Sequence, residues 1–223
     1  TEPPVFGSGG AAAASTEPAT EAREQPAQHW SAAPVTGRAP RREITSRRTV
    51  GIAALGASFL ARPEASRLLV VGAGRVASLA ADAFRAVRPI ARVEVWNHNA
   101  AGAERLVAAL RSRGIDAHVA TDLERAVGEA DIVSCATLAE RPVIKGAWLQ
   151  EGTHLDLIGS FTPFMREADD AALRRGRIYV DTYDALKESG ELLDPIRDGV
   201  IENILVVLEA GGEDQLGPAG LDR

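Results

Sequence analysis

A glycine-containing turn is the first feature of this sequence that could bind a ligand. The apolar run 67–71 leads into GAGRVA, residues 72–77, and a helical pattern follows. Gly72 can adopt a backbone angle closed to other residues, Gly74 leaves room for a diphosphate, and Ala77 lets helix and strand pack closely. The helix N-terminus adds free N–H groups and partial positive charge. The predicted diphosphate-binding residues are Gly72, Ala73, Gly74, Arg75, Val76 and Ala77; a tight turn without a ligand is the alternative.

A second group of polar residues follows the next apolar run, RVEVW, at residues 92–96. Asn97 stands 25 residues after Gly72, where NAD-specific proteins carry an acidic residue for the ribose. Asparagine can bond a ribose hydroxyl without repelling a 2′-phosphate, so NAD and NADP both stay open, with NADP favoured. His98 follows and is predicted either as a second cofactor contact or as a solvated loop residue.

Three later apolar runs also end in residues that could meet a ligand. Residues 134–137 (SCAT) end the fourth run, where a hydroxyl of Ser134 or Thr137 could meet the nicotinamide ribose, and Cys135 is interpreted as small core filling. Residues 159–163 (GSFTP) begin with Gly159, and residues 181–182 close a sixth run. Ligands of open α/β sheets lie beyond the carboxyl ends of the strands. We therefore expect these ends to line one site.

The elements that would position these residues alternate along the chain. The expected strands are RLLVV, RVEVW, DAHVA, DIVSCAT, THLDLIG and RIYVD. Helices are expected over 75–87, 100–113 and DLERAVGEA, with a short turn near KGAWL. An earlier helix, capped by Thr45 or Ser46, should end before Pro63. Strands separated by helices predict a doubly wound, Rossmann-like α/β fold with a parallel sheet over roughly 66–183.

Composition excludes several other classes of protein. The net charge of −6 does not favour nucleic acid or an anionic membrane as partner. A single cysteine excludes a disulfide framework and a multi-cysteine metal site, so no metal is expected, and it fits a reducing cytoplasm. Neither a membrane-spanning apolar run nor a secretory signal is visible. Residues 1–43 contain no leucine or isoleucine and are expected to be disordered, with a small irregular subdomain as the alternative.

Several stretches, taken in order, resemble the ornithine cyclodeaminase and mu-crystallin family. They are ITSRRT, LLVVGAGRVA, VEVWN, ADIVSCAT, LQEGTHLDLIGSFTPFMREAD and VDTYDALKESGEL, covering about 44–201. The resemblance implies a nucleotide-binding domain, 66–183, inserted between two parts of a substrate and dimerisation domain. Residues 44–65 would be a helix of that substrate domain, and 184–223 the return segment to it.

The resemblance also implies functional roles for particular residues. Gly72, Gly74 and Ala77 match the family's diphosphate turn, Asn97 its ribose position, and Thr137 a residue beside the cofactor; Gly159 belongs to the matched stretch after the fifth strand. Arg48 matches an arginine that binds a substrate carboxylate; from the residues alone it is a solvated helix charge. The implied activity is NAD(P)H-dependent reduction of a cyclic imino acid such as pyrroline-2-carboxylate, with a small imino or amino acid as partner and a homodimer when the substrate domain is complete.

Three departures from the family's pattern leave other functions open. Residues 1–44 contain no lysine to match the family's catalytic lysine, and the chain ends soon after the stretch 199–217, before the helices that complete the family's substrate domain, so an incomplete substrate domain is expected. Phe161 stands where cyclodeaminases carry an aspartate, which argues against that chemistry. The alternatives are a dinucleotide-binding protein with little or no catalysis, an interaction protein that retains the fold as a scaffold, and an ornithine cyclodeaminase. No proton donor is identified; His154 and Asp156 are polar residues of the fifth strand.

Overall fold

A computed structural model of the protein describes residues 41–201 and 204–206. The expectation of disorder for residues 1–43 therefore falls mostly outside the described residues. Its last three residues, Arg41 to Glu43, belong instead to the first helix, α1 (Arg41–Leu60).

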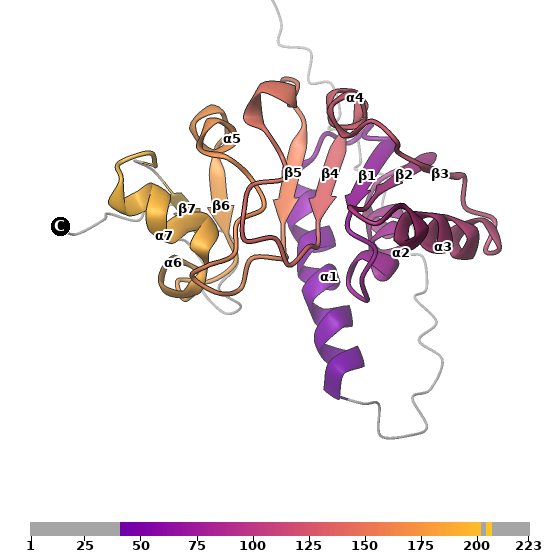
Figure 1. Ribbon diagram of the computed structural model, residues 1–223, viewed down its shortest axis with the longest axis horizontal. Helices are drawn as coiled ribbons and strands as arrows, with labels where there is room; N and C mark the ends of the chain where they lie inside the picture. Colours follow the sequence, from indigo (N-terminus) through magenta and orange to yellow (C-terminus); the bar gives the residue numbers. More distant parts are fainter. Residues whose placement is uncertain (1–40, 202–203, 207–223) are drawn as a thin grey trace, which may run out of the picture. The chain divides into compact units, whose positions relative to one another are not determined.

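Five parallel strands form the central sheet, in the order β3-β2-β1-β4-β5 (Figure 1). The strands are β1 (Arg67–Val71), β2 (Arg92–Trp96), β3 (Ala117–Val119), β4 (Ile132–Cys135) and β5 (His154–Leu157). Four of the five residues of β1, the central strand, are buried, as expected for a parallel sheet covered on both faces. The strand order reverses direction at β1, which is the topology of a doubly wound nucleotide-binding fold. The predicted fold class is confirmed.

Helices cover both faces of this sheet. One core contains side chains of α1, α2 (Ala77–Val87) and α3 (Ala100–Arg111). The opposite core contains side chains of α4 (Leu123–Glu129), the short 3₁₀ helix η1 (Gly146–Trp148) and α5 (Asp170–Arg175). No helix within residues 41–201 is both long enough and apolar enough to cross a membrane.

The start of α1 differs from the prediction. Thr45 and Ser46 do not cap the helix but lie inside it, and the hydroxyl of Thr49 donates to the carbonyl of Thr45 at 3.0 Å. Glu43 occupies the first turn and pairs with Arg47 one turn later at 3.0 Å. An acidic residue at a helix N-terminus and an i,i+4 ion pair both stabilise the helix, which explains why it extends beyond the expected cap.

Small side chains attach α1 to α2. The buried residues of α1 recur every three or four positions and are mostly alanines: Val50, Ala53, Ala54 and Ala57. Val50, Ala53 and Ala57 share a core with Ala77, Ala80, Ala81 and Phe84 of α2. The Arg88 guanidinium then donates to the carbonyls of Ser58 and Ala61 at 2.8 Å, satisfying acceptors that a helix C-terminus leaves unpaired.

The sixth expected strand, β6 (Ile178–Val180), does not join the central sheet. It pairs in parallel with β7 (Ile204–Val206) in a separate two-stranded sheet. The reason is a separate apolar cluster: β6 packs with the region of α6 (Ala185–Glu188) and α7 (Gly190–Arg197) through residues that include Val180, Leu192 and Ile201. The prediction that residues 181–182 end a strand of the central sheet is therefore wrong.

Asp131 joins the loop after α1 to the start of two strands. Its carboxylate accepts the backbone N–H groups of Ser66 and Arg67, at 2.9 and 3.0 Å, and pairs with the Arg62 guanidinium at 2.6 Å. Partial burial by itself would raise the pKa of this carboxyl, but the two backbone donors and Arg62 together lower it. The ionised form of Asp131 therefore stabilises the fold.

We predict that Asp131→Asn lowers the free energy of unfolding by about 1–2 kcal/mol at pH 7, because the substitution removes a charged acceptor. A lowered folded-state pKa contributes stability above the ordinary carboxyl value of about 3.9, and that contribution disappears as the pH falls through the lowered pKa. Urea denaturation of both proteins at pH 7 and near pH 3 tests this. The difference should shrink at the lower pH.

The matched control is Glu64→Gln, which neutralises an exposed carboxylate in the same loop. It should leave the unfolding free energy within about 0.5 kcal/mol of the parent. Equal losses in both variants would show that Asp131 has no special role.

Candidate dinucleotide-binding site

The carboxyl ends of the central strands align at one edge of the sheet. Val71 is in register with Trp96 of β2 and with Cys135 of β4, and Cys135 is in register with Leu157 of β5. The residues that follow these positions are Gly72, Asn97, Ala136 and Ile158. The structure therefore places the predicted residues Gly72, Asn97, Thr137 and Gly159 along one edge, as the sequence led us to expect.

The two glycines of the turn differ in what they make possible. Gly72 has φ of 112°, and a Cβ built on it would lie 2.6 Å from the carbonyl oxygen of Ala136. Its N–H donates to the Trp96 carbonyl at 2.8 Å. A Cβ on Gly74, by contrast, would meet no heavy atom within 4 Å. Gly72 is thus required by the fold itself, whereas Gly74 faces open space that a ligand can occupy.

The backbone after Gly72 presents unpaired donors. Within the described ranges, the N–H groups from Ala73 to Ala77 donate to no protein acceptor, and no side chain caps α2 at Val76. Five successive donors at the start of a helix, with the positive end of its dipole, form a site for an anion. Arg75 is exposed beside them, and Ala77 is buried against the sheet. These features match the predicted diphosphate site.

The loop after β2 orients Asn97. Its side-chain amide donates to the carbonyl of Asn99 at 2.9 Å, while the Asn99 side chain accepts from the N–H of Ala101 and caps α3. A Cβ on Gly102 would lie 2.6 Å from the amide nitrogen of Asn97, so α3 approaches this side chain closely. His98 is exposed. Asn97 is held at the position predicted for the ribose, and the role of His98 stays a prediction.

A buried carboxylate that sequence reasoning missed connects the ends of β4 and β5. Glu167 has no exposed surface, and its Oε1 accepts both the N–H and the hydroxyl of Thr137 at 2.7 Å. Its Oε2 accepts the N–H of Gly159 at 2.8 Å. A Cβ on Gly159 would lie 2.2 Å from the Thr137 carbonyl oxygen and 2.3 Å from Glu167 Oε1. Thr137 and Gly159 are thus brought together, and Glu167 holds them.

A second buried carboxylate supports the first. Glu191, at the start of α7, is 4% exposed and accepts the backbone N–H groups of Glu167 and Ala168 at 2.6 and 3.0 Å. Gly190, beside it, donates its N–H to the carbonyl of Thr162 at 3.0 Å. The only signal for either glutamate in the sequence was that MREAD and ESGEL belong to the stretches that carry the family resemblance.

Burial changes the protonation behaviour of this region. It raises the pKa of Glu167, and it raises the pKa of Glu191 to about 7 against the opposing effect of the backbone donors. Burial also raises the pKa of Asp156, which accepts from the Ser134 hydroxyl at 2.7 Å, to about 7. The Cys135 thiol is fully buried with a strongly raised pKa, so it acts as core filling, as interpreted.

The imidazole of His154 does not carry the second ring proton that it would need to act as a cationic acid near pH 7. Burial, with a smaller contribution from Arg88, lowers the pKa of its imidazole to about 4. The ring is therefore neutral near pH 7.

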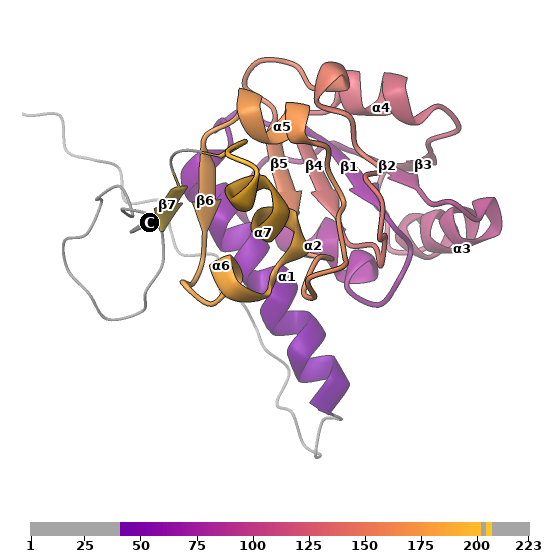
Figure 2. The same ribbon diagram turned by 60° about the vertical axis from the view of Figure 1, so that its left-hand side comes forward.

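Arg48 lies on a part of α1 that extends past the carboxyl edge of the sheet. Figures 1 and 2 both show the N-terminal half of α1 on the side of the β4 and β5 arrowheads. The Arg48 side chain is exposed and has no ion-pair partner within the described residues. No contact in the described part of the chain joins it to the glycine turn, so its predicted role in binding a carboxylate stays a prediction.

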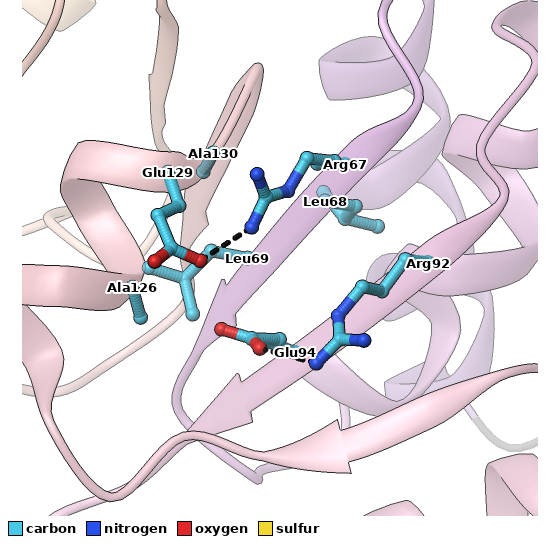
Figure 3. Close-up of a pocket in the computed structure, with 8 residues that line it drawn as sticks. All are labelled: Arg67, Leu68, Leu69, Arg92, Glu94, Ala126, Glu129 and Ala130. Atoms are coloured by element: carbon cyan, nitrogen blue, oxygen red, sulfur yellow. Dashed lines mark hydrogen bonds and ion pairs between the residues drawn. The ribbon is translucent and has the colours of Figure 1, made fainter.

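A charged pocket lies at the opposite edge of the sheet. Figure 3 shows Arg67 of β1, Arg92 and Glu94 of β2, and Glu129 of α4 around it. Arg67 and Arg92 are the first residues of their strands, and Arg67 pairs with Glu129 while Arg92 pairs with Glu94 at 3.0 Å. These charges compensate one another and lie away from the glycine turn. The pocket is an ion-pair cluster at the amino edge, separate from the candidate site.

Comparisons with known proteins agree with this geometry. The model of the ornithine cyclodeaminase/mu-crystallin family matches residues 41–213. A Delta(1)-pyrroline-2-carboxylate reductase of Paracoccus denitrificans is 48% identical over 160 residues, covering 71% of this chain and 51% of the relative. The ketimine reductase mu-crystallin of Rattus norvegicus is 32% identical over 151 residues, or 67% of this chain and 47% of the relative.

A solved structure has the same fold. It is the Delta(1)-pyrroline-2-carboxylate reductase of Thermococcus litoralis in complex with NADH and L-proline, with a TM-score of 0.69 and 31% identity over 71% of this chain and 50% of the other. The chain spans about half the length of these relatives.

We predict that Gly74→Val abolishes dinucleotide binding without unfolding the protein. The valine side chain would fill the space in front of the free N–H groups, and losing several charge-assisted hydrogen bonds should weaken binding by about a hundredfold or more. Calorimetric titration with NADH and NADPH, together with a thermal melt, tests this. Unchanged affinity in a folded variant would show that the diphosphate binds elsewhere.

Gly72→Ala is the matched comparison. The new Cβ would collide with the Ala136 carbonyl at a positive φ, so this variant should lose about 1–3 kcal/mol of stability. A Gly72→Ala protein as stable as the parent would contradict the structural role given to this glycine.

Proposed function

Because the chain belongs to the ornithine cyclodeaminase/mu-crystallin family, we propose that it is an NAD(P)H-dependent oxidoreductase that reduces a cyclic imino acid such as pyrroline-2-carboxylate. The observation that carries the cofactor is the row of N–H groups from Ala73 to Ala77, which have no acceptor among the described residues and lie in front of the open space at Gly74. The substrate class is supported by 48% identity to a Delta(1)-pyrroline-2-carboxylate reductase over 71% of this chain.

The residues of the site have separate tasks in this proposal. The N–H groups after Gly72 bind the diphosphate, and Asn97 bonds the adenine-side ribose. Its amide side chain carries no charge that would repel a 2′-phosphate, so either NAD or NADP fits. The nicotinamide, when bound, would supply a hydride to the carbon of the protonated C=N bond, whose nitrogen then becomes that of an amine. Thr137 and Gly159 follow β4 and β5, on the side of the glycine turn where the nicotinamide would lie.

Arg48 binds the carboxylate of the imino acid in this proposal. A guanidinium fork offers two parallel donors to a carboxylate. Arg48 is exposed, and it belongs to the half of α1 that projects beyond the carboxyl edge of the sheet. Its charge is therefore available to a ligand.

Ornithine cyclodeamination is the alternative that the same family offers. It requires a group that moves protons between two nitrogens. Phe161, 63% exposed on the loop after β5, can neither accept nor donate a proton. It can cover an apolar ring, whereas desolvating the side-chain ammonium of ornithine against it would cost several kcal/mol. The side chain at this position therefore favours imine reduction.

A homodimer and a cytoplasmic location complete the proposal. Ile44, Leu55 and Phe59 of α1 are 57%, 44% and 66% exposed, and apolar side chains of this size favour burial in an assembled protein. The single cysteine is buried and unpaired, which suits a reducing compartment.

The deciding experiment measures NADPH and NADH oxidation with pyrroline-2-carboxylate, alongside ammonia release from ornithine with NAD. We expect NADPH or NADH to be oxidised in the presence of the imino acid, and we expect no release of ammonia from ornithine. Tight cofactor binding without any oxidation would instead favour a dinucleotide-binding protein with little catalysis, and ammonia release at a rate typical of enzymes would favour the cyclodeaminase.

We further predict that Arg48→Gln raises the KM for the imino acid by about tenfold to a hundredfold, because a charged hydrogen bond to the carboxylate is lost. The dissociation constant of NADPH should not change, since Arg48 does not take part in the glycine turn. Steady-state kinetics and a cofactor titration measure the two quantities.

Arg47→Gln is the control, because Arg47 is the adjacent arginine on α1 and is already paired with Glu43. An equal rise in KM in both variants would indicate a general charge effect and would remove Arg48 from the substrate site.

A further inference from the structure

Glu167 forms hydrogen bonds to residues that follow two neighbouring strands of the central sheet. Its two carboxylate oxygens together accept three hydrogen bonds, two from Thr137 and one from Gly159. Each of these donors belongs to the second residue after the end of β4 or β5. A single buried side chain thus links the residues that follow two strands already paired in the sheet.

These strand ends lie on one particular side of the glycine turn. β1 has β2 as one neighbour and β4 as the other, and β5 lies beyond β4. In a doubly wound sheet the diphosphate sits at the turn after β1, and the adenine-side ribose reaches the end of β2. The nicotinamide half of the same molecule therefore extends over the ends of β4 and β5.

The support of Glu167 comes from far along the chain. Glu191 binds the backbone N–H groups of Glu167 and Ala168, and its own N–H lies 3.3 Å from the Ser160 hydroxyl oxygen in the loop after β5. The two buried carboxylates thus form a continuous connection from the start of α7 to the strand ends. Within the described residues, neither carboxylate forms an ion pair with a cation.

We propose that Glu167 is a positioning residue for the nicotinamide half of the cofactor, and that Glu191 transmits the position of α7 to it. The inference rests on the dinucleotide binding proposed above. Glu167 does not touch the cofactor; it holds the N–H of Gly159 and the N–H and hydroxyl of Thr137, so that the backbone and Thr137 methyl group present one fixed surface to the nicotinamide ribose.

The test compares two ligands that share the adenosine and the diphosphate and differ only in the nicotinamide half of the molecule. NADH carries the nicotinamide and the ribose attached to it, whereas ADP retains the diphosphate and lacks both groups. In Glu167→Gln the side-chain NH₂ replaces one acceptor oxygen and faces an N–H donor, so the link between Thr137 and Gly159 is broken while the pairing of β4 with β5 remains. We expect NADH affinity to fall by about tenfold to a hundredfold, the range for losing a hydrogen bond to a charged group, while ADP affinity stays unchanged.

ADP binding also reports whether the variant is folded. Equal losses for both ligands would mean that Glu167 serves only the fold, and equal affinities to those of the parent would mean that it positions nothing; either result overturns the proposal. Glu140→Gln is the matched control, because Glu140 is an exposed carboxylate three residues after Thr137. It should change neither affinity.

Glu191→Gln is a second, independent variant. Within the described residues, the hydrogen bonds of the Glu191 carboxylate go to the backbone N–H groups of Glu167 and Ala168, so the variant should reduce NADH affinity selectively and by less than Glu167→Gln. A Glu191→Gln protein that binds NADH as the parent does would overturn the role given to α7. Failure of the parent protein to bind either ligand would contradict the proposed function itself and is thereby distinguished from failure of this inference.

Discussion

Three strand ends approach one another so closely at the carboxyl edge that no side chain fits between them. A Cβ on Gly72 would lie 2.6 Å from the carbonyl oxygen of Ala136, and one on Gly159 would lie 2.2 Å from that of Thr137. These distances fix glycine at the ends of β1 and β5. They also bring backbone N–H groups within reach of a single carboxylate. The site depends on this close approach of backbone to backbone.

The backbone N–H groups at the carboxyl edge of the sheet fall into two sets. On the β4 and β5 side, the N–H groups of Thr137 and Gly159 are satisfied internally by Glu167, at the cost of burying a carboxylate. At the start of α2, the N–H groups from Ala73 to Ala77 have no protein acceptor within the described ranges. Buried donors need partners, and exposed donors at a helix start attract anions. The first set is therefore structural, and the second is available to a diphosphate.

Small side chains and two charged residues attach α1 to one face of the central sheet. α1 packs through alanines against α2, and Arg88 and Asp131 hold the region where α1 ends and β1 begins. The small side chains allow the helix axes to approach closely, while larger apolar groups on α1, such as Phe59, remain exposed. α1 is thus both part of the nucleotide-binding unit and a surface for the remainder of the substrate domain in the proposed assembly.

The sequence by itself determined the glycine turn, the central strands and their parallel arrangement. These features depend on local signals: the apolar run before Gly72, the alternation of strands and helices, and the polar residues Asn97 and Thr137 at the strand ends. Tertiary structure decided the rest. It paired β6 with β7 because a separate apolar cluster competes with the central sheet. It also buried Glu167 and Glu191, whose partners lie 30 and 24 residues away in the chain. An acidic residue in a sequence gives no indication that distant backbone donors will satisfy it, since burial and hydrogen bonding arise only when those segments meet.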